Sequence, residues 1–261
     1  MEEGVNGTAT MNDQESRPSL IALFTDFGPR GIYTGQMEAV VAASGAGVPV
    51  IELCSDAPAF NPRASAYLLA ALAGEMPENT LFVCVVDPGV GGDRKPLSVH
   101  TGRYGFVGPD NGLLSQVVRR SDTCGLQTID WVPARFSDTF HGRDLFAPAA
   151  ARLSLGEQIP GTSMDPADMI GADWPADLNE IIYTDYYGNL LTGLRASQIE
   201  QDSLLEVNGQ TLSYRRTFCE AATGEPFWHA DSIGLVEFSV NGGSAAGVLG
   251  LKPGDSFGIK D

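Results

Sequence analysis

A carboxylate and a guanidinium stand seven residues apart, just after an apolar run. Residues 81–86 are apolar and end at Asp87, a glycine-rich turn follows at residues 88–92, and Arg94 lies just beyond it. Open α/β sheets build their ligand sites where strands end. We therefore expect a site around Asp87, although the same residues would also suit a tight turn that carries a solvated acid.

The ligand of such a site is not expected to be a phosphate. The first residue after the run is acidic, and its charge would repel a pyrophosphate. The chain also lacks the motifs Gly-x-x-x-x-Gly-Lys-Ser/Thr, His-Glu-x-x-His and Gly-x-Ser-x-Gly. A neutral or cationic ligand fits better, as does a sugar whose hydroxyl groups donate to a carboxylate.

Among the three histidines, His141 is the best candidate for proton transfer. It lies between an aromatic residue and a glycine, next to Arg143 and Asp144, just before a predicted helix. His100 stands at the end of a strand-like run, and His229 stands in a segment with proline and tryptophan that we interpret as a loop. We expect structural roles for these two.

Composition limits the partners of the chain. It has 261 residues, 43% of them hydrophobic, and a formal net charge of -17. An anionic surface disfavours nucleic acid and anionic lipid as partners. The four cysteines form no Cys-x-x-Cys pair, no apolar stretch reaches the roughly 18 to 20 residues that span a bilayer, and no secretory signal is visible. We expect a cytoplasmic protein with free thiols.

An α/β fold must position these groups. Strands expected at residues 20–24, 48–54 and 80–86 alternate with helices expected at 36–43 and 64–75. This alternation predicts a mostly parallel sheet. Further helices are expected at residues 113–119 and 144–154, and a short strand at 104–107.

The amino-acid composition of the chain changes at two points. Residues 1–18 are polar and predicted to be a disordered tail, and residues 19–165 to be the α/β domain. A segment rich in Pro, Gly and Asp then leads into a smaller β-rich domain at residues 176–261, a compact barrel or sandwich. Its expected strands are residues 180–184, 204–207, 211–214, 235–240 and 256–259.

Six motifs, in this order, resemble the S-adenosylmethionine hydroxide adenosyltransferases, which share a superfamily with the fluorinase and chlorinase enzymes. The motifs are TDFG (25–28), VVDPGVGGDR (85–94), GPDNGLL (108–114), TFHGRD (139–144), DYYGN (185–189) and the stretch 232–246. The resemblance covers nearly everything from Leu20 onward. It implies an N-terminal α/β domain, a C-terminal β-barrel-like domain, and a homotrimer in which each active site joins one N-terminal domain to a neighbour's C-terminal domain.

The implied reaction is attack of water or hydroxide on the ribose 5' carbon of S-adenosylmethionine, which expels methionine and leaves adenosine. The resemblance places the water-handling triad on Asp87, Arg94 and His141. Water, with a pKa near 15.7, is a poor nucleophile, and the sequence carries no metal motif. A guanidinium with an acid and an imidazole is a metal-free alternative, so we expect neither a metal nor a cofactor.

The resemblance also implies substrate contacts outside the triad. The implied contacts are Asp26 with the ribose hydroxyls, Phe60 with the nucleoside, Asp185 with the methionine ammonium, Asn189 with the adenine edge, Ser232 with the methionine carboxylate, and backbone near Val240 and Gly242 with adenine. One position departs from the family pattern. Relatives often carry an acid five positions after the Asp of TDFG, where this chain has Gly31.

Two alternatives stay open. Halogenating relatives carry an aromatic residue where Asp87 stands and lack the histidine of TFHGRD. A carboxylate beside a halide would repel it, so Asp87 and His141 favour water as the nucleophile. The alternatives are a halide-using, chlorinase-like transferase and a non-catalytic sensor that binds S-adenosylmethionine or adenosine.

Overall fold

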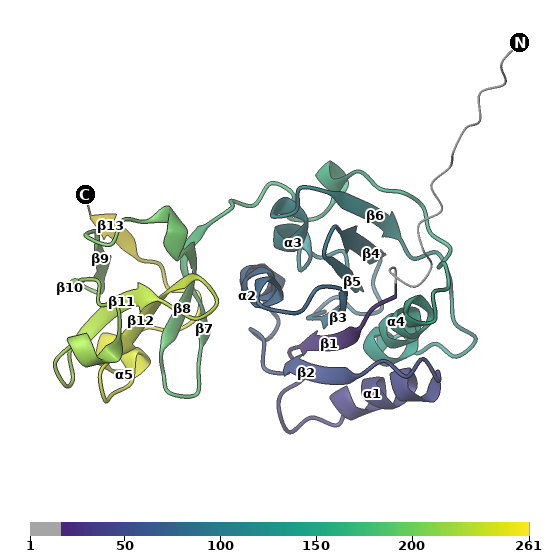
Figure 1. The fold of residues 1–261 in the computed structure, drawn as a ribbon, viewed down its shortest axis with the longest axis horizontal. Helices are drawn as coiled ribbons and strands as arrows, with labels where there is room; N and C mark the ends of the chain where they lie inside the picture. Colours follow the sequence, from purple (N-terminus) through teal and green to yellow (C-terminus); the bar gives the residue numbers. More distant parts are fainter. Residues whose placement is uncertain (1–16, 261) are drawn as a thin grey trace, which may run out of the picture.

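The computed structural model describes residues 17–260, in two lobes that Figure 1 shows side by side. The N-terminal lobe comprises residues 17–174 and the C-terminal lobe residues 178–260. The predicted disordered tail lies almost wholly outside the described residues, which begin at Arg17. Within that range no helix is long and apolar enough to cross a membrane.

A six-stranded sheet forms the centre of the N-terminal lobe, in the order β2-β1-β3-β5-β4-β6. Neighbours from β2 to β5 are parallel, whereas β4 is antiparallel to both β5 and β6. The predicted α/β class with a mostly parallel sheet is confirmed. The strands are β1 (Leu20–Thr25), β2 (Val50–Cys54), β3 (Thr80–Val85), β4 (Pro96–Thr101), β5 (Tyr104–Pro109) and β6 (Cys124–Thr128).

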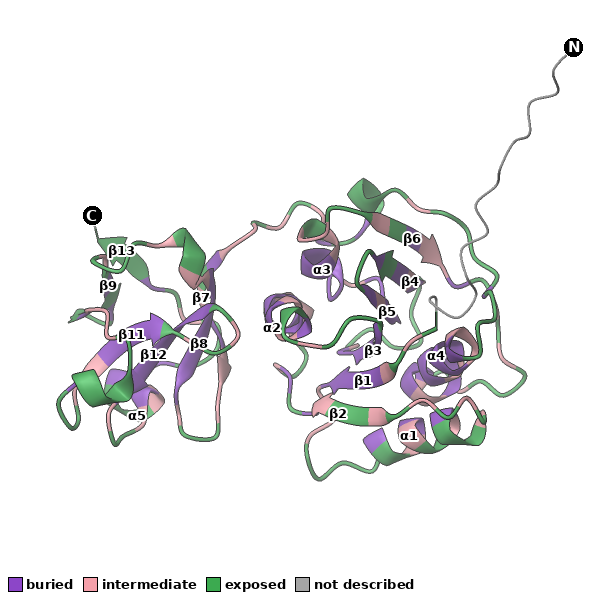
Figure 2. Ribbon diagram, viewed as in Figure 1, coloured by how far each residue is buried: buried purple, intermediate pink, exposed green. Residues whose placement is uncertain are grey.

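Helices cover both faces of this sheet. Along β1, Ile21 and Leu23 pack with α1 and α4, while Ala22 and Phe24 pack with α2 on the opposite face. Every residue of β3 is buried (Figure 2). The helices are α1 (Thr34–Ala43), α2 (Pro62–Gly74), α3 (Ser115–Arg119) and α4 (Ala147–Ser154), the last preceded by the π-helical turn η1 (Gly142–Phe146).

The C-terminal lobe consists of two antiparallel sheets, β11-β12-β8-β7 and β10-β9-β13. Side chains from both, among them Leu205, Trp228 and Phe238, share one core, so the predicted β-rich fold is confirmed. The interpretation of the segment around His229 as a loop is wrong, because it is strand β11. The elements are β7 (Leu178–Thr184), β8 (Leu190–Arg195), β9 (Leu204–Val207), β10 (Gln210–Leu212), β11 (Pro226–Ala230), β12 (Leu235–Val240), α5 (Ala245–Leu249) and β13 (Gly258–Lys260).

Candidate active site

Asp87, Arg94 and His141 meet at the carboxyl end of β3. The Arg94 Nε donates to both carboxylate oxygens of Asp87 at 3.0 and 2.9 Å, and the Arg94 Nη2 lies 2.6 Å from the Nδ1 of His141. The side chains of Arg94 and Asp87 are only 8% and 3% exposed. The guanidinium therefore joins an acid and an imidazole that are 54 residues apart in the chain, with little exposure of its own or of the acid's side chain.

Two loops hold this cluster together. Gly91 has a φ of +81°, and a Cβ there would lie 2.6 Å from the carbonyl oxygen of Asp138, so glycine allows the Asp87 loop to contact the loop that precedes His141. The second loop is anchored by Asp144, which accepts from the Ser137 backbone N–H at 3.0 Å and from the Arg143 guanidinium. The hydrogen bonds from Arg143 are the main cause of a lowered Asp144 pKa.

The surroundings of His141 favour its neutral form. Burial, followed by the positive charge of Arg94, lowers the pKa of the imidazole below its usual 6.5. The ring of Phe136 lies 4.6 Å from it, centroid to centroid. Because a guanidinium can only donate, the His141 Nδ1 accepts, and the proton of the neutral ring is on Nε2. That Nε2 is buried and has no hydrogen-bond partner within residues 17–260, so its N–H is an unsatisfied donor.

Asp26 and Phe60 lie at the same edge of the sheet. Asp26 follows β1, and its carboxylate accepts from the Phe60 backbone N–H at 3.1 Å. Asp26 and Asp87 follow neighbouring parallel strands, which pair up to Thr25 and Val85. Burial raises the pKa of Asp26, and the negative charge of Asp87 adds to this rise. Phe60 has a φ of 57° and is 80% exposed. Its ring is thus held out from the edge in a backbone conformation that few residues adopt.

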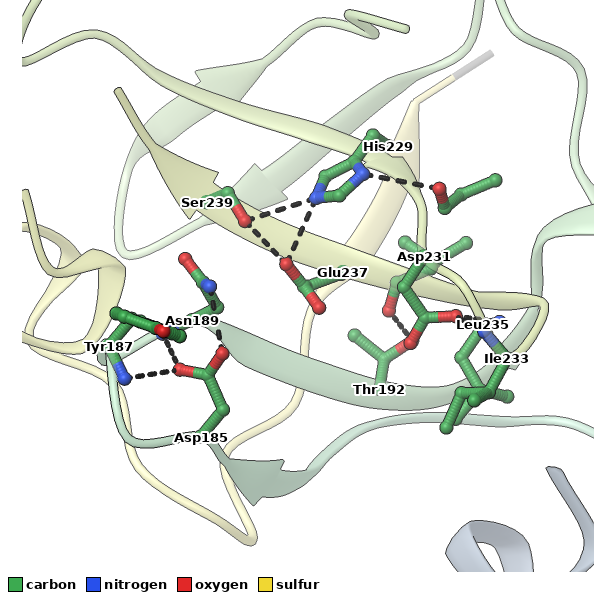
Figure 3. A network of polar contacts seen from close by, with 12 residues as sticks. Asp185, Tyr187, Asn189, Thr192, His229, Asp231, Ile233, Leu235, Glu237 and Ser239 are labelled. Atoms are coloured by element: carbon green, nitrogen blue, oxygen red, sulfur yellow. Dashed lines mark hydrogen bonds and ion pairs between the residues drawn. The ribbon is translucent and has the colours of Figure 1, made fainter. Parts of the chain in front are cut away.

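The other five predicted substrate residues gather in the C-terminal lobe. Asp185, Asn189, Ser232, Val240 and Gly242 line one cavity of about 880 Å³. Part of its wall is a turn that Asp185 organises, because its carboxylate accepts from the backbone N–H groups of Tyr187 and Asn189 and from the Asn189 side chain, at 2.8 to 2.9 Å (Figure 3). The DYYGN motif thus builds a rigid turn at the cavity.

Comparison with known proteins decides the family. The model of the SAM hydroxide adenosyltransferase N-terminal domain matches residues 21–162, and the model of the C-terminal domain of that family matches residues 179–257. The chain belongs to the SAM hydroxide adenosyltransferase family. The family resemblance seen in the sequence motifs is confirmed.

Relatives match this chain over almost its whole length. It is 33% identical over 253 residues to the (R)-S-adenosyl-L-methionine hydrolase of Salinispora arenicola, covering 92% of this chain and 97% of the relative. It is 35% identical over 253 residues to the hydrolase of the same name from Thermus thermophilus, covering 90% and 96%. An uncharacterized conserved protein from Thermotoga maritima has a crystal structure similar to this fold, with a TM-score of 0.83, 29% identity, and coverage of 92% of this chain and 100% of that one.

The cavity beside Arg94 and His141 is separate from the cavity of the C-terminal lobe. The cavity of about 490 Å³ beside Arg94 and His141 is lined by N-terminal residues, and the cavity of about 880 Å³ by C-terminal residues, as far as the described part of the chain shows. Among residues 17–260, no three His, Cys, Asp or Glu side chains are grouped as metal ligands would be.

Among the residues that line the C-terminal cavity, four that were not predicted as site residues bear on its chemistry. They are Phe218, His229, Asp231 and Glu237. Burial raises the pKa of Asp231 to about 6. His229 and Glu237 stand directly opposite each other on β11 and β12. In the sequence, His229 and Glu237 each stand between apolar neighbours, a pattern that indicates a strand with the polar side chain on one face. Only the strand register shows that the two residues are paired.

Proposed function

We propose that this chain is a hydrolase that converts S-adenosyl-L-methionine and water into adenosine and L-methionine. The observation that carries the proposal is the buried contact of Arg94 with both Asp87 and His141. The two relatives at 33% and 35% identity are named (R)-S-adenosyl-L-methionine hydrolases, which supports the same reaction here.

In the proposed step, a water oxygen attacks the ribose 5' carbon in line with the departing sulfur. A carbon–oxygen bond forms, the carbon–sulfur bond breaks, and its electron pair neutralises the sulfonium to give methionine. The proton released from the water passes to the Asp87 carboxylate, the basic group of the cluster, while His141 orients the water through its Nε2–H. Arg94 stabilises the negative charge that develops on the oxygen, and exclusion of water from the buried site strengthens this interaction.

The positions of the substrate contacts follow from this reaction. Asp26 and Phe60, beside the triad, are proposed to hold the ribose and the nucleoside. The set proposed for adenine and the methionine moiety lies in the C-terminal cavity, namely Asp185, Asn189, Ser232, Val240 and Gly242. A substrate that carries a sulfonium and an ammonium group suits a site with several carboxylates.

We further propose a homotrimer in which one chain's triad faces a neighbour's C-terminal cavity. The separation of the two cavities within one chain supports this arrangement, since a substrate must meet both sets of residues. We also propose that the reaction needs no metal or cofactor, and that the protein acts in the cytoplasm. The four unpaired cysteines support a reducing compartment.

Product analysis tests the proposal. Purified protein, dialysed against a chelator, is incubated with S-adenosylmethionine with and without chloride, and the products are separated by chromatography. Adenosine and methionine in equal amounts, independent of chloride, are expected. Formation of 5'-chloro-5'-deoxyadenosine as the main product would show a halide-using transferase instead. Binding of the substrate in calorimetry without any product over hours would show a sensor.

A further inference from the structure

Three carboxylates line the C-terminal cavity, and they differ in what is left to bind a ligand. Both oxygens of Asp185 accept hydrogen bonds from its own turn. In Asp231, Oδ1 accepts from the backbone N–H groups of Ile233 and Leu235, and Oδ2 is shut off from solvent. Asp185 can therefore bind a ligand only with the lone pairs that its own turn leaves free, and Asp231 offers no oxygen that is both open to the cavity and unoccupied.

Glu237 is the exception. Its Oε1 lies 3.0 Å from the His229 Nε2 and accepts from the Ser239 hydroxyl at 2.7 Å (Figure 3). Its Oε2 accepts no hydrogen bond from residues 17–260, and it is not among the buried unpartnered atoms of that range. Since Glu237 lines the cavity, this second oxygen faces the space where a ligand would lie.

The strands fix this carboxylate in place. His229, Glu237 and Leu191 are directly opposite one another on β11, β12 and β8, so their side chains share one sheet face, and all three line the cavity. An ionised carboxylate can only accept hydrogen bonds, so His229 carries a proton on Nε2 and donates a hydrogen bond to Oε1. Because two donors hold Oε1, the position of Oε2 at the cavity is fixed as well.

We propose that Glu237 is a substrate-contacting residue that determines specificity by accepting an N–H donor of the substrate at Oε2, with His229 and Ser239 as its positioning residues. The inference rests on the proposed function, because S-adenosylmethionine carries two amino groups, the methionine α-ammonium and the adenine 6-amino group. Either group can donate an N–H hydrogen bond to a carboxylate oxygen. A fixed, buried acceptor rejects analogues that lack the donor, since the carboxylate would then stay unpaired.

Calorimetry with the two products, adenosine and L-methionine, tests the proposal on wild-type protein and on Glu237→Gln. Glutamine keeps the shape and can still accept from His229 and Ser239, but it turns a donor toward the ligand. A contact of an amino group with a carboxylate predicts that binding weakens about 10- to 100-fold for one product alone. Weaker adenosine binding identifies the adenine amino group, and weaker methionine binding identifies the ammonium. In turnover, KM should rise while kcat changes little.

Matched variants make the result decisive. Glu206→Gln alters an exposed acid on β9 that pairs with Lys260 and should leave both dissociation constants unchanged. If Glu237→Gln does not fold, Ser239→Ala, which removes one donor to Oε1, should weaken the same single product by a smaller factor. Dissociation constants within twofold of wild type, or an equal loss for both products, would overturn the proposal. Failure of wild-type protein to hydrolyse S-adenosylmethionine would overturn the proposed function instead.

Discussion

Removing the charge of Asp87 while keeping the shape of its side chain should lower the free energy of unfolding, because Asp87 is the counter-charge of a buried arginine. In Asp87→Asn the guanidinium of Arg94, only 8% exposed, loses its counter-charge, and an amide N–H₂ comes to face it. The remaining side-chain partner among the described residues is the neutral His141 Nδ1, at 2.6 Å. Removing one partner of a buried ion pair typically destabilises a protein by about 3 to 5 kcal/mol, because an uncompensated charge stays buried.

Equilibrium urea unfolding, followed by tryptophan fluorescence at one fixed protein concentration, measures this loss. The double variant Asp87→Leu with Arg94→Met is the control. It removes both charges and fills similar volume, so it should recover most of the lost stability. A loss below about 1 kcal/mol in Asp87→Asn, or a double variant as unstable as the single one, would refute the reasoning that the pair is buried and mutually dependent.

Three further predictions concern turnover and the substrate cavity. Replacing His141 or Asp87 by Ala should lower the kcat for S-adenosylmethionine by roughly 10² or more, and an unchanged kcat would remove that residue from the mechanism. Because the pKa of His141 is lowered, its ring becomes protonated only at a pH below the usual 6.5, so the acid limb of kcat/KM should have its midpoint below 6.5. Phe136→Ala, which opens the ring to water, should move that midpoint up, and a pH profile that does not move would contradict this. Gly188→Ala should lower the free energy of unfolding in urea by roughly 1 to 3 kcal/mol, because φ is +86° and the new Cβ would clash with the Ser244 side chain. Gly254→Ala, with φ +96° and open space around the new Cβ, should lower it less.

The sequence alone predicts the parallel part of the N-terminal sheet well, because buried parallel strands are continuous apolar runs with turn residues at their ends. The run before Asp87 is β3, which is fully buried. The strand-like run that ends at His100 lies in β4, whereas β6 was not predicted, since its pattern is short and its pairing depends on an antiparallel neighbour. β11 was also missed, because it starts at Pro226, and proline suggests a loop although it is allowed at the first position of a strand.

The site was predictable in its parts but not in its geometry. A candidate at Asp87 follows from the end of a strand, yet its contact with His141 through Arg94 depends on two loops that approach each other at Gly91. Glu237 could not be found from the sequence, because one acid in an apolar strand shows neither its partners nor the direction of its free oxygen. The strand register, which pairs it with His229, supplies both.

Isotope labelling of the product tests the central claim most directly. Wild-type protein is incubated with S-adenosylmethionine in water enriched in oxygen-18, and adenosine and methionine are analysed by mass spectrometry. Attack of water at the 5' carbon predicts one heavy oxygen in the 5' hydroxyl of adenosine and none in methionine. Unlabelled adenosine, or a nucleoside that carries a halogen at this carbon, would contradict water activation by Asp87, Arg94 and His141.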